Sequence, residues 1–304
     1  MGHPMVLNFF FFLEFFLCLT AISALSVAKP GCQETCGNFS VPYPFGIGNT
    51  NCYRDLTFEL ICNDTYYNPP KLFWATNLEV VNISLLGQIG TLGYVSNYCY
   101  NSQGYVTSGN NPSFNLNDNT FSFSDTENKF TAIGCDTLAY LFAFNGENFT
   151  SGCAMISTNI EELINGSCTG IGCCQTSIPK GFRYFEIAIS SYYNHTKVYD
   201  FNPCSSAFVV DYNWYNFSTS DLLNFTYNLD NYGYARAPVV LDWAINNWPM
   251  ETDISCEEAM NNQTSYACGN NSVCGVSKNG LGYSCNCSQG YQGNPYLQDG
   301  CQGT

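Results

Sequence analysis

Residues Cys32–Gly48, CQETCGNFSVPYPFGIG, contain two cysteines, a glycosylation acceptor at Asn38 and a Pro-Tyr-Pro-Phe-Gly run. Proline holds φ at about −65° and keeps the residue before it extended, so Pro42 and Pro44 predict a stiff segment. The glycines that follow supply the flexible backbone that ends it. We interpret this stretch as a structural corner held by disulfides at the start of the mature chain.

A targeting segment precedes this corner. Residues 6–25 are mostly apolar, and Ser26-Val27-Ala28 places small residues where a signal peptidase requires them. The sequence therefore predicts a signal peptide over residues 1–28, with cleavage after Ala28. The alternative is an uncleaved signal anchor, because the apolar run approaches the ~20 residues of a membrane span and no Lys or Arg precedes it.

Composition limits the classes of function. Cleavage after Ala28 leaves 276 of the 304 residues, enough for two modest domains. Nine basic and 23 acidic residues remain, and the resulting charge of −14 disfavours nucleic acid as a partner. Seventeen of the 18 cysteines remain, which indicates disulfides formed in an oxidising compartment. Because His195 is then the single histidine, the sequence predicts no metal site, and it predicts no cofactor.

Glycosylation acceptors also indicate a secreted protein, and most should lie on the surface. The eleven Asn-x-Ser/Thr acceptors are Asn38, Asn63, Asn82, Asn148, Asn165, Asn194, Asn216, Asn224, Asn262, Asn270 and Asn286.

The first part of the mature chain has the pattern of a β-rich, loop-rich domain. Thr57–Cys62, Leu78–Leu86 and Thr120–Ser124 carry β-branched and aromatic residues in partial alternation, separated by Asn, Gly, Pro and Ser. Aromatic residues make up 16% of the chain, and we interpret most of them as core packing between disulfides.

The next part contains a helix candidate and a pair of adjacent cysteines. Thr158 and Glu161 form a capping-box pattern, and Gly166 is placed to end the helix. Neighbouring cysteines bond each other only with strain, so Cys173 and Cys174 should reach different partners and connect distant segments.

Several motifs together resemble one family. The opening corner, Ser96-Asn-Tyr-Cys99-Tyr, Phe130-Thr-Ala-Ile-Gly-Cys135, Cys204-Ser-Ser-Ala-Phe-Val-Val and Pro238-Val-Val-Leu-Asp-Trp243 resemble the extracellular region of plant wall-associated receptor kinases. The resemblance implies a galacturonan-binding domain over residues 29–147 and a C-terminal-type ectodomain segment over 148–250. The expected fold class is mainly β and disulfide-rich, with two β-rich segments followed by a small module.

The last 54 residues resemble an epidermal-growth-factor-like module, which we place at residues 251–304. Its cysteine pairing is implied by that resemblance: Cys256 with Cys274, Cys268 with Cys285, and Cys287 with Cys301. Calcium-binding modules of this type carry an acidic cluster before the first cysteine and an Asp or Asn where this chain has Lys278. We therefore expect no calcium in this module.

Cysteine parity predicts an unpaired thiol. Eleven cysteines lie between Cys32 and Cys204 inclusive, so one of them has no partner in that region. Relatives in the family commonly carry a cysteine four residues after the one that matches Cys153, and this chain has Ser157 there. The hypothesis is that Ser157 leaves one thiol free; a rearranged pairing is the alternative.

The sequence does not favour an enzyme. It lacks the glycine-rich loop, the His-Arg-Asp loop and the Asp-Phe-Gly triplet of protein kinases, so either it is a kinase-less secreted member or it is a fragment of a longer receptor. No pair of carboxylates is marked for glycoside hydrolysis. Serine chemistry would require His195, which we expect to be exposed because it lies inside the acceptor Asn194-His-Thr196.

The resemblance implies non-catalytic binding of pectin or oligogalacturonides at the face between cell wall and plasma membrane. Because galacturonan is a polyanion, binding to this acidic chain requires a local basic cluster, bridging calcium, or methyl-esterified stretches that contact aromatic rings. The cations of the first two segments are Arg54, Lys71, Lys129, Lys180, Arg183, Lys197 and Arg236.

Lys180 and Arg183 are the closest pair of these cations in sequence, so they are the candidate carboxylate contact, and Arg54 beside Tyr53 is the second candidate. Solvated surface charges are the alternative interpretation of these residues. The alternative function is a protein-interaction ectodomain that binds a peptide or a co-receptor.

Overall fold

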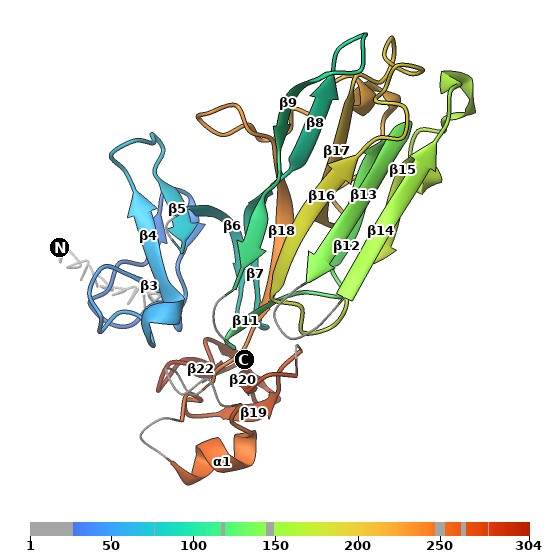
Figure 1. The fold of residues 1–304 in the computed structure, drawn as a ribbon. Helices are drawn as coiled ribbons and strands as arrows, with labels where there is room; N and C mark the ends of the chain where they lie inside the picture. Colours follow the sequence, from blue (N-terminus) through green and yellow to red (C-terminus); the bar gives the residue numbers. More distant parts are fainter. Residues whose placement is uncertain are drawn as a thin grey trace, which may run out of the picture.

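The computed structural model describes residues 27–75, 77–116, 119–143, 149–246, 253–262, 266–278 and 280–304. These residues form mostly β-strands with eight disulfides, which confirms the predicted fold class. Figure 1 shows a tall β-sandwich, a smaller unit that carries β3 to β5 beside it, and the C-terminal module below both. The leader up to Ser26 and the acceptor Asn148 lie outside the described residues.

Three sheets make up most of the structure. The seven-stranded sheet has the order β11 (Phe121–Phe123), β18 (Arg236–Trp243), β7 (Gln88–Tyr94), β6 (Leu78–Ser84), β5 (Lys71–Trp74), β4 (Glu59–Asn63) and β3 (Gly46–Ile47). The five-stranded sheet has the order β15 (Thr169–Ser177), β12 (Asn128–Gly134), β17 (Cys204–Asp211), β8 (Ser96–Tyr100) and β9 (Val106–Asn110). The four-stranded sheet has the order β10 (Ser113–Asn115), β16 (Tyr184–Ser190), β13 (Asp136–Ala143) and β14 (Phe149–Ile156).

Short elements complete the fold. The remaining strands are β1 (Thr35–Cys36), β2 (Phe39–Ser40), β19 (Ser272–Val276), β20 (Tyr283–Cys287), β21 (Tyr291–Gly293) and β22 (Cys301–Gly303). The helical elements are the 3₁₀ turns η1 (Leu56–Phe58), η2 (Ile160–Glu162) and η3 (Thr219–Leu222), and one helix, α1 (Cys256–Asn261).

Alternation along the strands builds two cores. On β17, Ala207 and Val209 face the main core, whereas Phe208 and Val210 face a second cluster. Successive strand residues point to opposite faces of a sheet, so a strand that is apolar at every position can be buried on both sides. The main core lies between the five-stranded and four-stranded sheets and continues to the seven-stranded sheet, and η3 with its flanking loops contributes to the second cluster.

The two β-rich segments expected from sequence share their sheets. Strand β18 lies between β11 and β7, and its register pairs Arg236 with Tyr94 and Asp242 with Gln88. The expected boundary between residues 147 and 148 falls between β13 and β14, which are hydrogen-bonded neighbours in one sheet. The two segments therefore form one interleaved body.

The opening corner is held by two disulfides and a buried ring. Cys32 bonds Cys52 and Cys36 bonds Cys62. Phe45 is fully buried. A side chain at Gly46 would place its Cβ 2.2 Å from the carbonyl oxygen of Cys52, so only glycine allows this approach.

The predicted helix is instead the single 3₁₀ turn η2. Its N-cap is Asn159, whose side chain accepts a hydrogen bond from the backbone N–H of Glu161 at 3.0 Å, so the capping box expected at Thr158 does not form. Leu163 is half-buried and Ile164 is exposed. A segment that buries so little apolar surface has too little packing to stabilise a longer helix.

The adjacent cysteines do reach different partners, as predicted, but at unequal distances along the chain. Cys174 bonds Cys153 and joins β15 to β14 of the facing sheet. Cys173 bonds Cys168, only five residues away, so the expectation that it connects distant segments is wrong. This disulfide closes a short local loop between residues 168 and 173.

The C-terminal module contains the three disulfides that the resemblance implies, Cys256 to Cys274, Cys268 to Cys285 and Cys287 to Cys301. It is joined to the rest of the protein by backbone hydrogen bonds in both directions between Tyr283 and Ile245. The side-chain amide of Asn294 also donates to the carbonyl oxygens of Val27 and Tyr43, both at 2.7 Å. The module is therefore packed against the opening corner.

These contacts bear on the start of the mature chain. The carbonyl oxygen of Val27 also accepts from the backbone N–H of Tyr43 at 2.9 Å, and Ala28 is 3% exposed. Cleavage after Ala28 would remove these groups. Cleavage after Ser26 would keep Val27 and Ala28 in the mature chain. It also presents small residues to the peptidase, because Ala24 lies two residues before Ser26. We expect N-terminal sequencing of the secreted protein to begin at Val27; a start at Lys29 would contradict this expectation.

Cys135 is the free cysteine among the described residues, and it is fully buried. Burial raises the pKa of its thiol to about 12. Ser157 donates its backbone N–H to the carbonyl oxygen of Cys135 at 2.7 Å, and the next pair along these strands is Asp136 with Ile156. The predicted unpaired thiol is therefore present, and Ser157 lies directly opposite it.

The variant Ser157→Cys should restore a disulfide with Cys135. Residues opposite each other on antiparallel strands lie at the Cα separation that a disulfide requires. The bond should raise the free energy of unfolding by about 3 kcal/mol. Denaturant titration measures this gain, and thiol labelling after unfolding should fall from one reactive cysteine between Cys32 and Cys301 to none. Ser157→Ala is the control, and equal labelling of the two variants would contradict the pairing.

Candidate functional site

A charged cluster lies on one face of the seven-stranded sheet. Lys71 on β5 places its Nζ 2.9 Å from Oε1 and 3.0 Å from Oε2 of Glu79 on β6. Arg236 on β18 places its Nη1 3.0 Å from Oε2 of the same carboxylate. The Lys71 side chain is 37% exposed and that of Arg236 is 9% exposed. We call this surface, formed by Lys71, Glu79, Tyr94 and Arg236 with Tyr67, the Lys71 face.

An aromatic ring lies beside the exposed cation of the Lys71 face. The Nζ of Lys71 lies 5.0 Å from the centroid of the Tyr67 ring, within the range of a cation–π interaction. Asn231 donates its side-chain amide to the Tyr67 hydroxyl at 3.3 Å. Next to these two residues, Tyr66 and Tyr232 are 80% and 87% exposed. The loop before β18 is thereby joined to the start of β5.

The face combines opposite charges without a net excess. Asp230, whose Oδ1 accepts the backbone N–H groups of Tyr232 and Tyr234 at 2.9 Å, adds a second carboxylate to the two cations and Glu79. Burial and the nearby charge of Asp230 raise the pKa of the Tyr94 hydroxyl, so this group remains a neutral donor. On a chain of net charge −15, a region with no net charge repels an incoming anion less than the average surface does.

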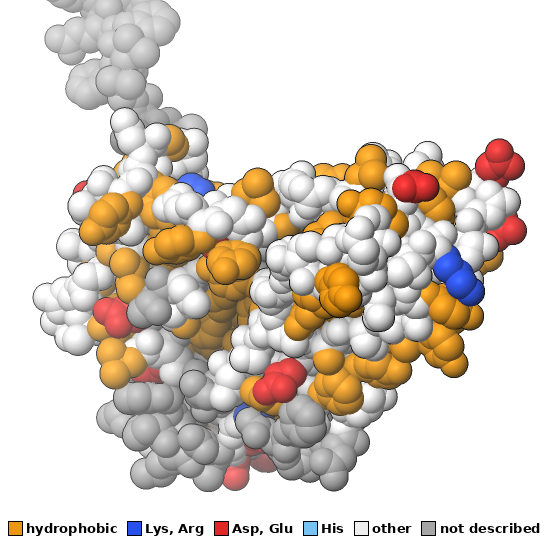
Figure 2. Space-filling view, turned by 45° about the horizontal axis from the view of Figure 1, so that its top comes forward, with side chains coloured by type: hydrophobic (Ala, Val, Ile, Leu, Met, Phe, Trp, Pro, Cys, Tyr) orange, Lys and Arg blue, Asp and Glu red, His pale blue; other side chains and the backbone are white. Residues whose placement is uncertain are grey.

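A cleft of about 370 Å³ lies between the β5–β6 turn and β10, and Tyr94 of the Lys71 face also lines it. Trp74, Leu78 and Phe114 are among its lining residues, and each is less than 9% exposed. Trp74 donates its Nε1–H to the carbonyl oxygen of Thr57 at 2.9 Å. Figure 2 shows one face of the molecule, with a hollow above hydrophobic side chains and few charged groups.

The structure separates Tyr53 and Arg54 from the Lys71 face. Tyr53 is 3% exposed, and its hydroxyl donates to Glu59 at 3.3 Å, so its ring has no free surface for a sugar. Arg54 is half-buried and lies close enough to Tyr283 and Tyr296 of the C-terminal module to act on their pKa values. Arg54 therefore belongs to the contact between the opening corner and that module, whereas Tyr53 is part of the main core.

Lys180 and Arg183 lie neither in the Lys71 face nor with Tyr53 and Arg54. Lys180 is exposed, and its Nζ is 3.5 Å from where a Cβ of Gly280 in the C-terminal module would stand. Arg183 is half-buried and donates a hydrogen bond to the side-chain oxygen of Asn119. The exposed Lys278 lies two residues before Gly280. The structure therefore places Lys180 next to the C-terminal module, whereas Arg183 is held by Asn119.

Sequence reasoning included Lys71 and Arg236 among the cations but did not join them. Lys71 and Glu79 lie eight residues apart across a turn between paired strands, a spacing that could have been tested as a cross-strand ion pair. Arg236 joins the same carboxylate from 157 residues away, and no local pattern marks that contact.

The comparisons with known proteins agree with the sequence motifs. Residues 32–95 match the family described as wall-associated receptor kinase galacturonan-binding. The chain is 38% identical over 89% of its length to "Wall-associated receptor kinase 2" of Arabidopsis thaliana and 38% identical over 93% to "Wall-associated receptor kinase 5". This chain is a relative of the wall-associated receptor kinases.

The chain covers only 34% and 36% of those two kinases, so it spans about a third of their length. "Wall-associated receptor kinase-like 3" from the same plant is 27% identical over 91% of the chain. No solved structure matches. Within the described ranges, no helix is long and apolar enough to cross a membrane, and no group of three or more His, Cys, Asp or Glu side chains is placed to hold a metal ion.

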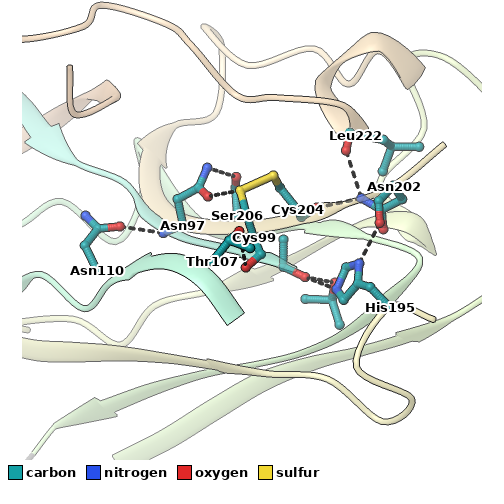
Figure 3. The surroundings of a disulfide bond; sticks show 11 residues. Asn97, Cys99, Thr107, Asn110, His195, Asn202, Cys204, Ser206 and Leu222 are labelled. Atoms are coloured by element: carbon teal, nitrogen blue, oxygen red, sulfur yellow. Dashed lines mark hydrogen bonds between the residues drawn. A yellow bond between two sulfur atoms is a disulfide. The ribbon is translucent and has the colours of Figure 1, made fainter. Parts of the chain in front are cut away.

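His195 of this wall-associated kinase relative is fully buried, so the expectation that it is exposed is wrong. Its Nδ1 lies 2.6 Å from the carbonyl oxygen of Asn202, and its Nε2 lies 2.9 Å from Oγ of Ser205. Figure 3 shows His195 and Asn202 beside the Cys99–Cys204 disulfide. Ser205 is also 0% exposed, so this serine–histidine pair has no access to a substrate and acts as a structural connection.

Asp136 supports the same buried network. Its carboxylate accepts hydrogen bonds from the hydroxyl of Ser191 and from the backbone N–H groups of Tyr192, Tyr193 and His195. Burial alone would raise the pKa of this carboxyl, but these hydrogen bonds lower it below its ordinary value. The charged form of Asp136 therefore stabilises the loop that carries His195.

The buried imidazole should make stability depend on pH. Burial lowers the pKa of His195 below its ordinary value. Below about pH 6.5 the unfolded chain gains a proton that the folded chain does not, so the free energy of unfolding should fall as pH falls, by up to about 1.4 kcal/mol per pH unit. Asp136 adds a loss in the same direction, but only below about pH 4, where the unfolded carboxyl is protonated.

Denaturant titrations between pH 7 and pH 5 measure this effect. The variant His195→Gln, which cannot ionise, should show a flatter dependence than the wild type over this window. An NMR titration of the single histidine beyond residue 28 gives an independent value for the folded state. A ring that titrates at or above pH 6.5 would contradict the assignment.

Proposed function

We propose that this chain binds galacturonan without catalysing a reaction, at the outer face of the cell where it meets the wall. The observation that carries this proposal is the match of residues 32–95 to a galacturonan-binding family, because this segment contains Lys71, Glu79 and Tyr94 of the Lys71 face. The similarity to wall-associated receptor kinases supports an extracellular location. The chain lacks the kinase motifs, which supports a non-enzymatic role.

The Lys71 face has the groups that a galacturonate unit requires. The Nζ of Lys71 has three donors, and the Lys71 side chain is 37% exposed beside Glu79, so the ammonium group can also bind a ligand carboxylate. The exposed rings of Tyr66 and Tyr232 offer flat apolar surfaces on which the C–H groups of a sugar ring can stack. A carboxylate contact flanked by aromatic surface suits a polymer that repeats an acid and a ring in each unit.

The sequence-predicted residues supply a second site for the same ligand. Lys180 is exposed and approaches Gly280 of the C-terminal module, Arg183 follows it by three residues, and the exposed Lys278 precedes Gly280 by two residues. This region lies outside residues 32–95. Bridging calcium between ligand carboxylates and the acidic surface is another route to binding, and it requires neither site.

The variant Lys71→Gln should weaken binding to de-esterified oligogalacturonides about fivefold, which corresponds to about 1 kcal/mol for a partly exposed ion pair. Titration calorimetry of the secreted protein at low salt measures the change, with calcium and with chelator. The difference between wild type and variant should shrink at physiological salt, because screening weakens contacts between exposed charges. Fully methyl-esterified galacturonan should bind both proteins equally.

Lys129→Gln is the matched control, and Lys180→Gln and Arg183→Gln test the second region. Lys129 lies on β12, where its Nζ contacts Ser177 at 2.9 Å. Loss of affinity in the Lys180 or Arg183 variant, with Lys71→Gln unchanged, would move the site to the second region. Binding that depends on calcium but on none of these cations would support the bridged mode. If the wild type binds neither form of galacturonan, the proposed function is wrong and a protein partner should be sought.

A further inference from the structure

A groove of about 650 Å³ is lined in part by the loop before β18, the same loop that supplies Asp230 to the Lys71 face. One wall is formed by β8 and β9, and the opposite wall by the segment between η3 and β18. Its residues on the second wall include Leu223, Asn224, Leu229 and Tyr234. The groove is thus lined by none of the residues that define the Lys71 face, and its Cys204 adjoins the buried His195 network through Asn202.

The groove has a rigid, uncharged lining. The Cys99–Cys204 disulfide and Phe225, which is 2% exposed, contribute to it. On the β8–β9 wall, the side-chain oxygen of Asn110 accepts the backbone N–H of Asn97 at 2.9 Å (Figure 3). The side-chain amide of Asn110 donates to the carbonyl oxygen of Val95, also at 2.9 Å. The residues that line the groove, all in the described part of the chain, carry no charged side chain. Such a lining favours a neutral ligand that has hydroxyl and amide groups.

The rim of the groove exposes apolar surface. Leu223, Leu229 and Tyr234 are 56%, 48% and 50% exposed. Scattered exposed apolar residues are normal, but these three line one concave feature. A covering ligand would therefore remove contiguous apolar area from water and gain free energy from it.

An N-glycosylation acceptor stands in this lining. In Asn224-Phe225-Thr226, Asn224 and Thr226 are exposed. The ring of Phe225 packs in the second core, where its centroid lies 4.8 Å from that of Phe208. The buried Phe225 fixes the backbone of the acceptor, so a glycan on Asn224 begins at the groove itself. A covalently attached ligand has a high effective concentration there and loses little translational freedom on docking.

We propose that the N-linked glycan of Asn224 folds back into this groove and covers it. The core of an N-glycan is neutral and carries acetamido and hydroxyl groups, which match the uncharged polar wall. The apolar face of a sugar ring can stack on Tyr234, whose ring is half exposed. The glycan thus serves as a built-in part of the surface, and a soluble ligand could use the groove only by displacing it.

Endoglycosidase digestion of the secreted glycoprotein tests this proposal, with site-resolved glycopeptide mass spectrometry as the readout. The glycan on Asn224 should be released at least about tenfold more slowly than the glycan on Asn82, an exposed acceptor on β6, because release requires the docked glycan to leave the groove. After unfolding, the two rates should become equal. An unoccupied Asn224, or equal rates in the folded protein, would overturn the proposal.

Two variants distinguish the glycan from the side chain that carries it. Asn224→Gln and Thr226→Ala both abolish the acceptor, but the second retains the asparagine. Both should increase the fluorescence of a dye that binds apolar surface, whereas Asn82→Gln should leave it at the wild-type level. An increase in Asn224→Gln alone, or in neither variant, would contradict a covering glycan. Galacturonan binding does not enter this readout, so the outcome is independent of the proposed function.

Discussion

The packing of Trp243 joins three parts of the chain. Its ring centroid lies 5.4 Å from Phe45 of the opening corner, 5.6 Å from Phe58, and 5.4 Å from Tyr296 of the C-terminal module. Edge-to-face aromatic pairs contribute about 0.5–1.5 kcal/mol each beyond the burial of area. A small disulfide-bonded module buries little apolar surface by itself. Here the ring of Trp243 covers part of that surface, so the orientation of the module is fixed by the core of the neighbouring sheet.

Sequence reasoning reached the parts of this fold that depend on local chemistry. The spacing of six cysteines implied the C-terminal module, and parity arithmetic indicated one unpaired thiol with Ser157 as its cause, but not that the free cysteine is Cys135. The interleaving of strands was not accessible in the same way. Strand β18 pairs with β7 across roughly 150 residues, and the alternation of apolar residues shows which face a strand buries but not which neighbour it selects.

The site residues illustrate the same limit. The acceptor Asn194-His-Thr196 correctly places its asparagine on the surface, but Asn194 and His195 both adopt positive φ, at 51° and 59°. That turn directs the next side chain inward, where it stacks on Tyr100 at 4.6 Å. Proximity in sequence made Lys180 and Arg183 the natural pair of cations. The cations that do share a carboxylate, Lys71 and Arg236, come from strands separated by more than half of the mature chain.

Arg236 connects the two surfaces to which we assign binding. Its backbone N–H donates to the carbonyl oxygen of Tyr227, and its Nε donates to that of Asn228, each at 3.0 Å, while its Nη1 binds Glu79 on β6. The loop that begins at these carbonyls supplies Asp230 and Asn231 to the Lys71 face and Tyr234 to the groove. A buried guanidinium that is paired in this way holds the loop in one position, because the loss of any partner would leave a buried charge without compensation. The charged face and the uncharged groove therefore share one loop, and the position of that loop depends on a single buried side chain.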